Sequence, residues 1–92
     1  MPEIKLHLIT TYYMQMIPTI KVSTFLNIRQ ENHLSQPELY LVEDDSTPEV
    51  LKPIMVLAEN QSIAVESPDM IEFIGTFTEK SNKDVFMVFE LK

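Results

Sequence analysis

The chain has 92 residues but no cysteine, no tryptophan and only one glycine. Without cysteine it has neither disulfides nor thiolate ligands for a metal ion. With a single glycine, Gly75, it cannot build the glycine-rich loops that cradle phosphate groups in many nucleotide-binding proteins. These absences exclude disulfide-stapled scaffolds, cysteine-based zinc modules and the common phosphate-binding loops.

Basic residues are scarce as well, because seven lysines and arginines stand against fourteen acidic residues, for a net charge of -7. Nucleic-acid binding depends on Lys and Arg side chains that displace counterions from phosphates, so we expect no direct nucleic-acid partner. Two interpretations of the acidic balance stay open. It steers the protein toward a basic surface of another protein, or it serves solubility alone.

Long apolar runs are also missing, and the N-terminal segment MPEIKLHLITTYY carries an acidic residue early. This segment has the pattern of neither a signal peptide nor a membrane span, so we expect a cytoplasmic protein without a membrane partner. A hydrophobic fraction of 45% predicts one small folded domain over residues 1–92. Dimerisation would add buried area and cover strand edges, so both a monomer and a homodimer stay open.

The clearest pattern lies in residues 71–91, IEFIGTFTEKSNKDVFMVFEL. β-Branched and aromatic residues alternate with polar ones on both sides of the polar segment 79–84. Such alternation predicts two antiparallel strands joined by a loop, that is, a β-hairpin. Gly75 stands in the first of these strands, where it predicts a bulge, a sharp twist or a close approach of another backbone.

Shorter alternating segments predict further strands at residues 3–9, 12–17, 21–30, 38–42, 54–57 and, briefly, 62–65. Pro18 is expected to end the second strand. In the third, Leu26 and Ile28 are expected to share one face and Phe25 the other. No stretch of ten residues has helical spacing. The sequence therefore predicts an all-β or mainly β domain of six to seven short antiparallel strands, a small sandwich or open barrel closed by the C-terminal hairpin.

Residues suited to catalysis or metal binding do not form a recognisable set. His7 lies in a strand pattern and His33 in a turn-like segment, with no HxH or HExxH spacing. Three consecutive carboxylates at 43–45 suit a hard cation, but the segment lacks the glycine and spacing of an EF-hand, which favours a solvated loop. No elbow motif marks a nucleophile. We expect a protein that is not an enzyme and uses no metal or cofactor.

The acidic run 43–49 is the longest polar segment of the chain and is expected to form an exposed loop. Its carboxylates would steer the protein toward a basic partner, and a nearby tyrosine would anchor the contact. The candidate protein-binding residues are Tyr40, Glu43, Asp44, Asp45 and Glu49.

The C-terminal hairpin also carries a family resemblance. Residues 72–77, EFIGTF, and 85–90, VFMVFE, resemble the closing "YIGTF... VFHVFE" segment of a family of short phage and prophage proteins of uncharacterised function. Residues 16–18, 25–30 and 37–44 resemble its methionine-proline step and following strands. Met87 departs from the usual histidine, and residues 58–59 depart from a common threonine-glycine step. The resemblance implies a viral or prophage origin and a β-rich fold.

Three hypotheses follow for function. The first is a phage-encoded, non-enzymatic protein that inhibits a bacterial host protein, such as a defence protein, by stoichiometric contact through its acidic surface. The second is an oligomer that sequesters a signalling nucleotide. The few groups suited to it are Lys5, Tyr12, Lys21, Arg29 and Lys52. The third is a virion or assembly accessory protein, for which association of edge strands would suffice.

Overall fold

A computed structural model of the chain describes residues 3–20, 23–32, 34–43, 49–62, 67–80 and 83–92. Seven strands and one short 3₁₀ turn lie in these parts, and no α-helix does. The strands are β1 (Glu3–Leu8), β2 (Met14–Ile20), β3 (Ser23–Arg29), β4 (Glu38–Glu43), β5 (Glu49–Ala58), β6 (Ile71–Thr78) and β7 (Val85–Leu91), and the turn is η1 (Pro68–Met70). The expected all-β fold is confirmed.

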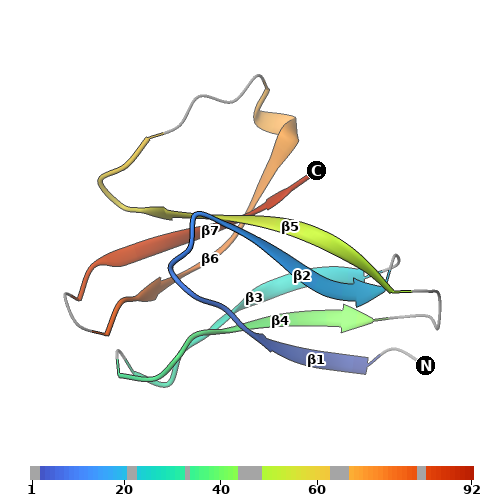
Figure 1. Ribbon diagram of the computed structural model, residues 1–92, viewed down its shortest axis with the longest axis horizontal. Coiled ribbons are helices and arrows are strands. Elements are labelled where there is room, and N and C mark those ends of the chain that lie inside the picture. Colours follow the sequence, from blue (N-terminus) through green and yellow to red (C-terminus); the bar gives the residue numbers. More distant parts are fainter. Residues whose placement is uncertain (1–2, 21–22, 33, 44–48, 63–66, 81–82) are drawn as a thin grey trace.

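The strands form two antiparallel sheets with the orders β1-β4-β3 and β2-β5-β7-β6. Figure 1 shows the four-stranded sheet above the three-stranded one, with η1 beyond the four-stranded sheet on its outer side. β6 and β7 pair along their lengths, so the expected C-terminal hairpin is confirmed. In the described residues, no helix is long and apolar enough to cross a membrane.

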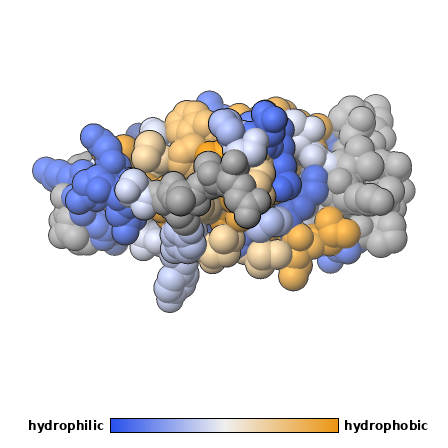
Figure 2. Space-filling model, turned by 90° about the horizontal axis from the view of Figure 1, so that it is seen from above, coloured by the Kyte–Doolittle hydropathy of each residue, from blue (hydrophilic) through white to orange (hydrophobic). Residues whose placement is uncertain are grey.

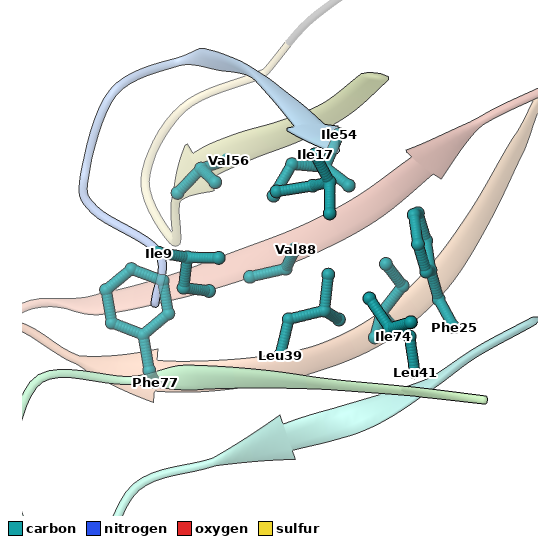
Figure 3. Close-up of a cluster of buried hydrophobic side chains, with 10 residues drawn as sticks. All are labelled: Ile9, Ile17, Phe25, Leu39, Leu41, Ile54, Val56, Ile74, Phe77 and Val88. Carbon is teal, nitrogen blue, oxygen red and sulfur yellow. The ribbon is translucent and has the colours of Figure 1, made fainter. Parts of the chain in front are cut away.

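The hydrophobic core lies between the two sheets, where both contribute inward-facing side chains (Figure 3). The buried cluster consists of Ile9, Ile17, Phe25, Leu39, Leu41, Ile54, Val56, Ile74, Phe77 and Val88. The Phe77 ring stacks on Phe86, with 5.4 Å between the ring centroids. Each fully buried aliphatic side chain contributes about 1.5–3 kcal/mol to stability, so this layer is the main source of the fold's stability.

The sheets meet along a seam between the edge strands β3 and β6. Both strands carry a register shift there, between Phe25 and Asn27 in β3 and between Phe73 and Gly75 in β6. A Cβ on Gly75 would stand 3.2 Å from the backbone nitrogen of Ile28. The lone glycine therefore marks both a bulge and a close backbone approach, as its position in the sequence predicts.

Further along the seam, the side chain of Gln30 forms the pair of hydrogen bonds that a backbone would form between neighbouring strands. The Gln30 amide nitrogen donates to the Thr78 carbonyl at 2.7 Å, and its oxygen accepts from the Thr78 N–H at 2.8 Å. This pair of bonds ties the end of β3 to the end of β6.

Three local expectations were wrong. β2 runs through Pro18, because β2 is an edge strand and tolerates a missing N–H. The strand expected at 54–57 is longer, because β5 begins at Glu49 and runs through Pro53, whose position precedes the start of the pairing with β7 at Ile54. In β3 the bulge places Phe25 and Ile28 on the same, core-facing side, opposite the inward-facing residues of β4. The brief strand expected at 62–65 falls almost wholly on residues 63–66, which lie outside the described residues.

Candidate functional site: an apolar outer sheet face

The first strand turns its apolar side chains away from the core. Three residues alternate along it with exposed fractions of 67, 44 and 55%: Ile4, Leu6 and Leu8. Leu6 lies opposite Tyr40 of β4, and directly opposed residues of an antiparallel pair share a face. The neighbours of Tyr40 on β4, Leu39 and Leu41, are buried in the core. The three apolar residues, called here the β1 stripe, therefore lie on the outer face of the three-stranded sheet.

The polar residues of β1 lie on the opposite side of the strand. Lys5 is paired with Leu41 and His7 with Leu39, so both are on the side that faces the core. Lys5 forms an ion pair with Glu3 at 3.3 Å. The two side chains are 52 and 65% exposed, so the contribution of this pair to stability is small. β1 thus has the reverse of the usual polarity for a strand that covers a core.

β4 and β3 extend the apolar surface beyond β1. Tyr40 and Val42 are half-buried at the centre of the sheet, and Leu26, the extra residue of the β3 bulge, is 49% exposed. We call the β1 stripe, these residues and the surface between them the outer apolar face. With three strands of six or seven residues it measures roughly 20 Å by 15 Å, or about 300 Å². Its charged residues are the opposed pair Arg29 and Glu38 at one end.

The four-stranded sheet also has apolar residues on its outer side. Met14, Met16, Leu51 and Phe73 are between 45 and 61% exposed, and the Phe73 ring packs edge-on against Phe89 at 5.6 Å. Figure 2 looks onto this side of the molecule, and hydrophobic areas in orange are interleaved with hydrophilic ones. In Figure 1, η1 lies on the outer side of this sheet, and it contacts β6, the strand into which it leads. The three-stranded sheet has no described segment over its outer face in that view.

The predicted acidic site is divided by the fold. Glu43 ends β4 and Glu49 begins β5, so both flank the segment 44–48 at the same end of the sandwich. Asp44 and Asp45 lie outside the described residues. Tyr40 faces outward, whereas Glu43 shares the core-facing side of β4 and lies opposite Ser23. Tyr40 therefore belongs to the outer apolar face, and the acidic site stays a prediction.

The groups considered for nucleotide binding do not come together in the described part of the chain. The Lys52 ammonium donates to the Ser23 carbonyl at 2.9 Å and lies 5.8 Å from the centre of the Phe25 ring. Arg29 and Tyr12 lie at the other end of the sandwich, where β3 ends and β2 begins. Lys5 is at the open edge on β1, and Lys21 lies outside the described residues.

A pocket of about 340 Å³ opens where the β1–β2, β3–β4 and β6–β7 connections meet. Ile9 and Phe77 from the core are among the residues that line it, and Lys80 is its one basic residue among those described. The volume suits a small ligand, but a single lysine is a weak counterpart for a polyphosphate. In the described parts of the chain, no group of three His, Asp or Glu residues is placed to hold a metal ion.

The sequence predicts the alternation in β1, but it does not predict that the apolar side of the strand is exposed. Alternation shows that a strand has two chemically different faces, and it does not show which face the second sheet covers. The presence of Lys5 and His7 on the other side was equally compatible with either orientation. No family model, curated protein or solved structure matches this chain.

Proposed function

We propose that the protein is a non-enzymatic binding domain that acts by stoichiometric contact with another protein. The contact surface in this proposal is the outer apolar face. The observation that carries it is the exposure of Ile4, Leu6 and Leu8 on one side of a regular strand. The largest apolar patch on a typical monomer measures about 300–600 Å² and is often functional, because water contact with such side chains is unfavourable.

Charge and anchor residues support a partner with a basic surface. The net charge of -7 favours encounter with a positively charged protein and opposes nucleic acid. Glu3 and Glu43 lie opposite each other at the end of the sheet where the acidic run 43–49 begins. Tyr40, half-buried at the middle of the face, is the kind of aromatic residue that dominates binding energy at interfaces.

The resemblance of the C-terminal hairpin to phage proteins directs the proposal toward a bacterial host. We propose that the partner is a host protein, and that occupation of its basic surface inhibits it. Within this proposal, the class of target is a host defence protein.

The test compares two matched variants in capture experiments from a bacterial lysate. Leu26→Asp places a charge on the outer apolar face, and Leu51→Asp places the same charge on the other sheet at a similarly exposed leucine. We expect the original protein and Leu51→Asp to retain one host protein, less of it at high salt, and Leu26→Asp to lose it. Titration calorimetry with the purified partner should then give a defined stoichiometry. Equal capture by both variants, or none by the original protein at any ionic strength, would contradict the proposal.

A further inference from the structure

Four strands form the edges of the two sheets, and they differ in protection. β3 and β6 are bulged and lie against each other at the seam. β2 carries Pro18, which cannot donate to an added strand. β1 has no proline, and its register with β4 is unbroken over its six residues. Edge strands usually carry such devices because a bare edge pairs with other strands. β1 carries one such device, Lys5 on its core-facing side. Among the described edges, β1 is the one with neither a proline nor a bulge, so its backbone groups are the most open to pairing.

The register shows which backbone groups of β1 face this open edge. Directly after β1, the Ile9 N–H donates to the Pro37 carbonyl at 3.0 Å. In an antiparallel ladder, bonded and non-bonded pairs alternate, so Lys5 and His7 also direct their backbone groups toward β4. The residues between them belong to the β1 stripe, and their N–H and C=O groups therefore point outward.

We infer that β1 pairs with β1 of a second copy, antiparallel and about a twofold axis at Leu6, and that the two three-stranded sheets form one six-stranded sheet. In this register Leu6 lies opposite its own counterpart, and Ile4 lies opposite Leu8. Each outward N–H of the stripe then meets an outward C=O of the other copy. On the core-facing side, Lys5 of each copy lies opposite His7 of the other. Polar residues are therefore paired with polar ones, and apolar residues with apolar ones.

The β1 edge is complementary to itself, which favours a second copy of the chain as its partner. A slip of one residue would oppose leucines to Lys5 and His7 and would misalign the outward N–H and C=O groups. The twofold arrangement also gives a closed pair, as an isologous contact requires. A single paired edge buries less than a standard interface of roughly 1,600 Å², so we expect an equilibrium between monomer and dimer that depends on concentration.

Pairing would also join the two outer apolar faces into one surface of about 600 Å², twice the footprint of a single sheet. A surface of this size approaches the roughly 800 Å² that each partner contributes to a standard interface. Only this consequence depends on the proposed function; the pairing itself depends on β1 alone.

Because the chain has no cysteine, single-cysteine variants can report the register directly. Opposed residues of a bonded pair have Cα atoms about 5.5 Å apart, a separation that a disulfide spans. We expect Leu6→Cys to form a covalent dimer under mild oxidation. Ile4→Cys should not, since the two Ile4 positions would lie about 14 Å apart, but a mixture of Ile4→Cys and Leu8→Cys should cross-link. Cross-linking of Ile4→Cys alone as readily as Leu6→Cys would overturn the register.

Sedimentation velocity of the purified protein, without any partner, tests the association itself. Leu6→Pro removes an outward N–H and leaves the bonds to β4 intact, so it should fold and stay monomeric. Leu51→Glu, on the other sheet, should dimerise like the original protein. The inference would be overturned if the wild-type protein stayed monomeric at every concentration and Leu6→Cys did not cross-link. Since no host protein is present, that result would leave the proposed function to its own capture test.

Discussion

Gly75 of β6 lies against Asn27 of β3, and a Cβ on Gly75 would stand 2.7 Å from the Asn27 Oδ1 atom. That oxygen is not free to move away without loss, because it accepts a hydrogen bond from the Ile28 N–H at 2.8 Å. The bulges of both strands occur at this point. The absence of a side chain at position 75 therefore sets how closely the two sheets approach each other along the seam.

Gly75→Ala should destabilise the protein by about 1–3 kcal/mol, the usual range for overpacking of a tight site. The added methyl group would have to displace Asn27 and would still lie close to Ile28. Urea denaturation measures the free energy of unfolding, and Thr76→Ala, at the exposed neighbouring residue, is the control. A stability gain in Gly75→Ala, the result expected if only the entropy of the unfolded chain changed, would show that the contact is not limiting.

Gln30→Ala should lower the free energy of unfolding by about 1–3 kcal/mol, because it leaves the N–H and C=O of Thr78 without the bonds that Gln30 supplies. Arg29→Ala, at the exposed adjacent residue, should change stability by no more than about 0.5 kcal/mol. Hydrogen exchange gives a second readout, since the Thr78 amide should lose protection in Gln30→Ala. An unchanged exchange rate would mean that the side chain does not hold the seam.

The alternation of apolar and polar residues was sufficient to predict most of the strands. It was not sufficient to predict which face of each strand is buried. The alternation around Gly75 predicted both the hairpin and the close approach, because both are local consequences of where side chains are and are not. The outward exposure of Leu6 could not be predicted, because it depends on where the second sheet ends. Bulges have the same effect, since the extra residue Leu26 reverses the faces of the residues that follow it. The prediction that Pro18 ends β2 was wrong for a similar reason, because a proline interrupts a strand only where a neighbouring strand needs its N–H.

The candidate site shows the same division between local and long-range information. Glu43 and Glu49 were predicted to belong to an exposed loop over residues 43–49, but Glu43 is the last residue of β4 and Glu49 the first of β5. Their grouping with Tyr40 came from proximity in sequence. A strand sends residues three apart to opposite faces, and the tyrosine consequently lies with the apolar residues of the outer face.

Thr19→Val should raise the free energy of unfolding by about 1 kcal/mol, because it replaces a buried hydroxyl by a methyl group of similar shape. Thr19 is 2% exposed, and its Oγ1 atom has no hydrogen-bond partner in the described structure. Thr24→Val, at an exposed threonine of β3, controls for the higher strand propensity of valine. Thermal and urea denaturation measure both variants. A loss of stability specific to Thr19→Val would indicate that the hydroxyl has a partner in solution.

Lys83→Gly should stabilise the β6–β7 hairpin, because Lys83 has a left-handed backbone with φ of 59°. Its N–H donates to the Glu79 carbonyl at 2.9 Å, and the Glu79 N–H donates to the Asp84 carbonyl at 2.7 Å, so the turn holds the residue in this conformation. Left-handed geometry costs a residue with a Cβ about 1–2 kcal/mol, and the greater freedom of glycine in the unfolded chain offsets about 0.5–1 kcal/mol of the gain. We therefore expect a net increase of about 0.5–1 kcal/mol in the free energy of unfolding.

Lys80→Gly is the matched control for this change, because it removes the same charge from the same loop at a residue without positive φ. It should destabilise the protein slightly, by up to about 1 kcal/mol, since only the unfolded-chain term applies. Lys83→Val should destabilise it more, because a β-branched side chain tolerates the left-handed region poorly. If Lys83→Gly and Lys80→Gly changed the urea midpoint equally, the strain at Lys83 would not be present in solution. Opposite signs for the two glycine variants would indicate that the β6–β7 connection is strained at Lys83 alone. The pairing of β6 with β7 would then hold Lys83 in its left-handed conformation.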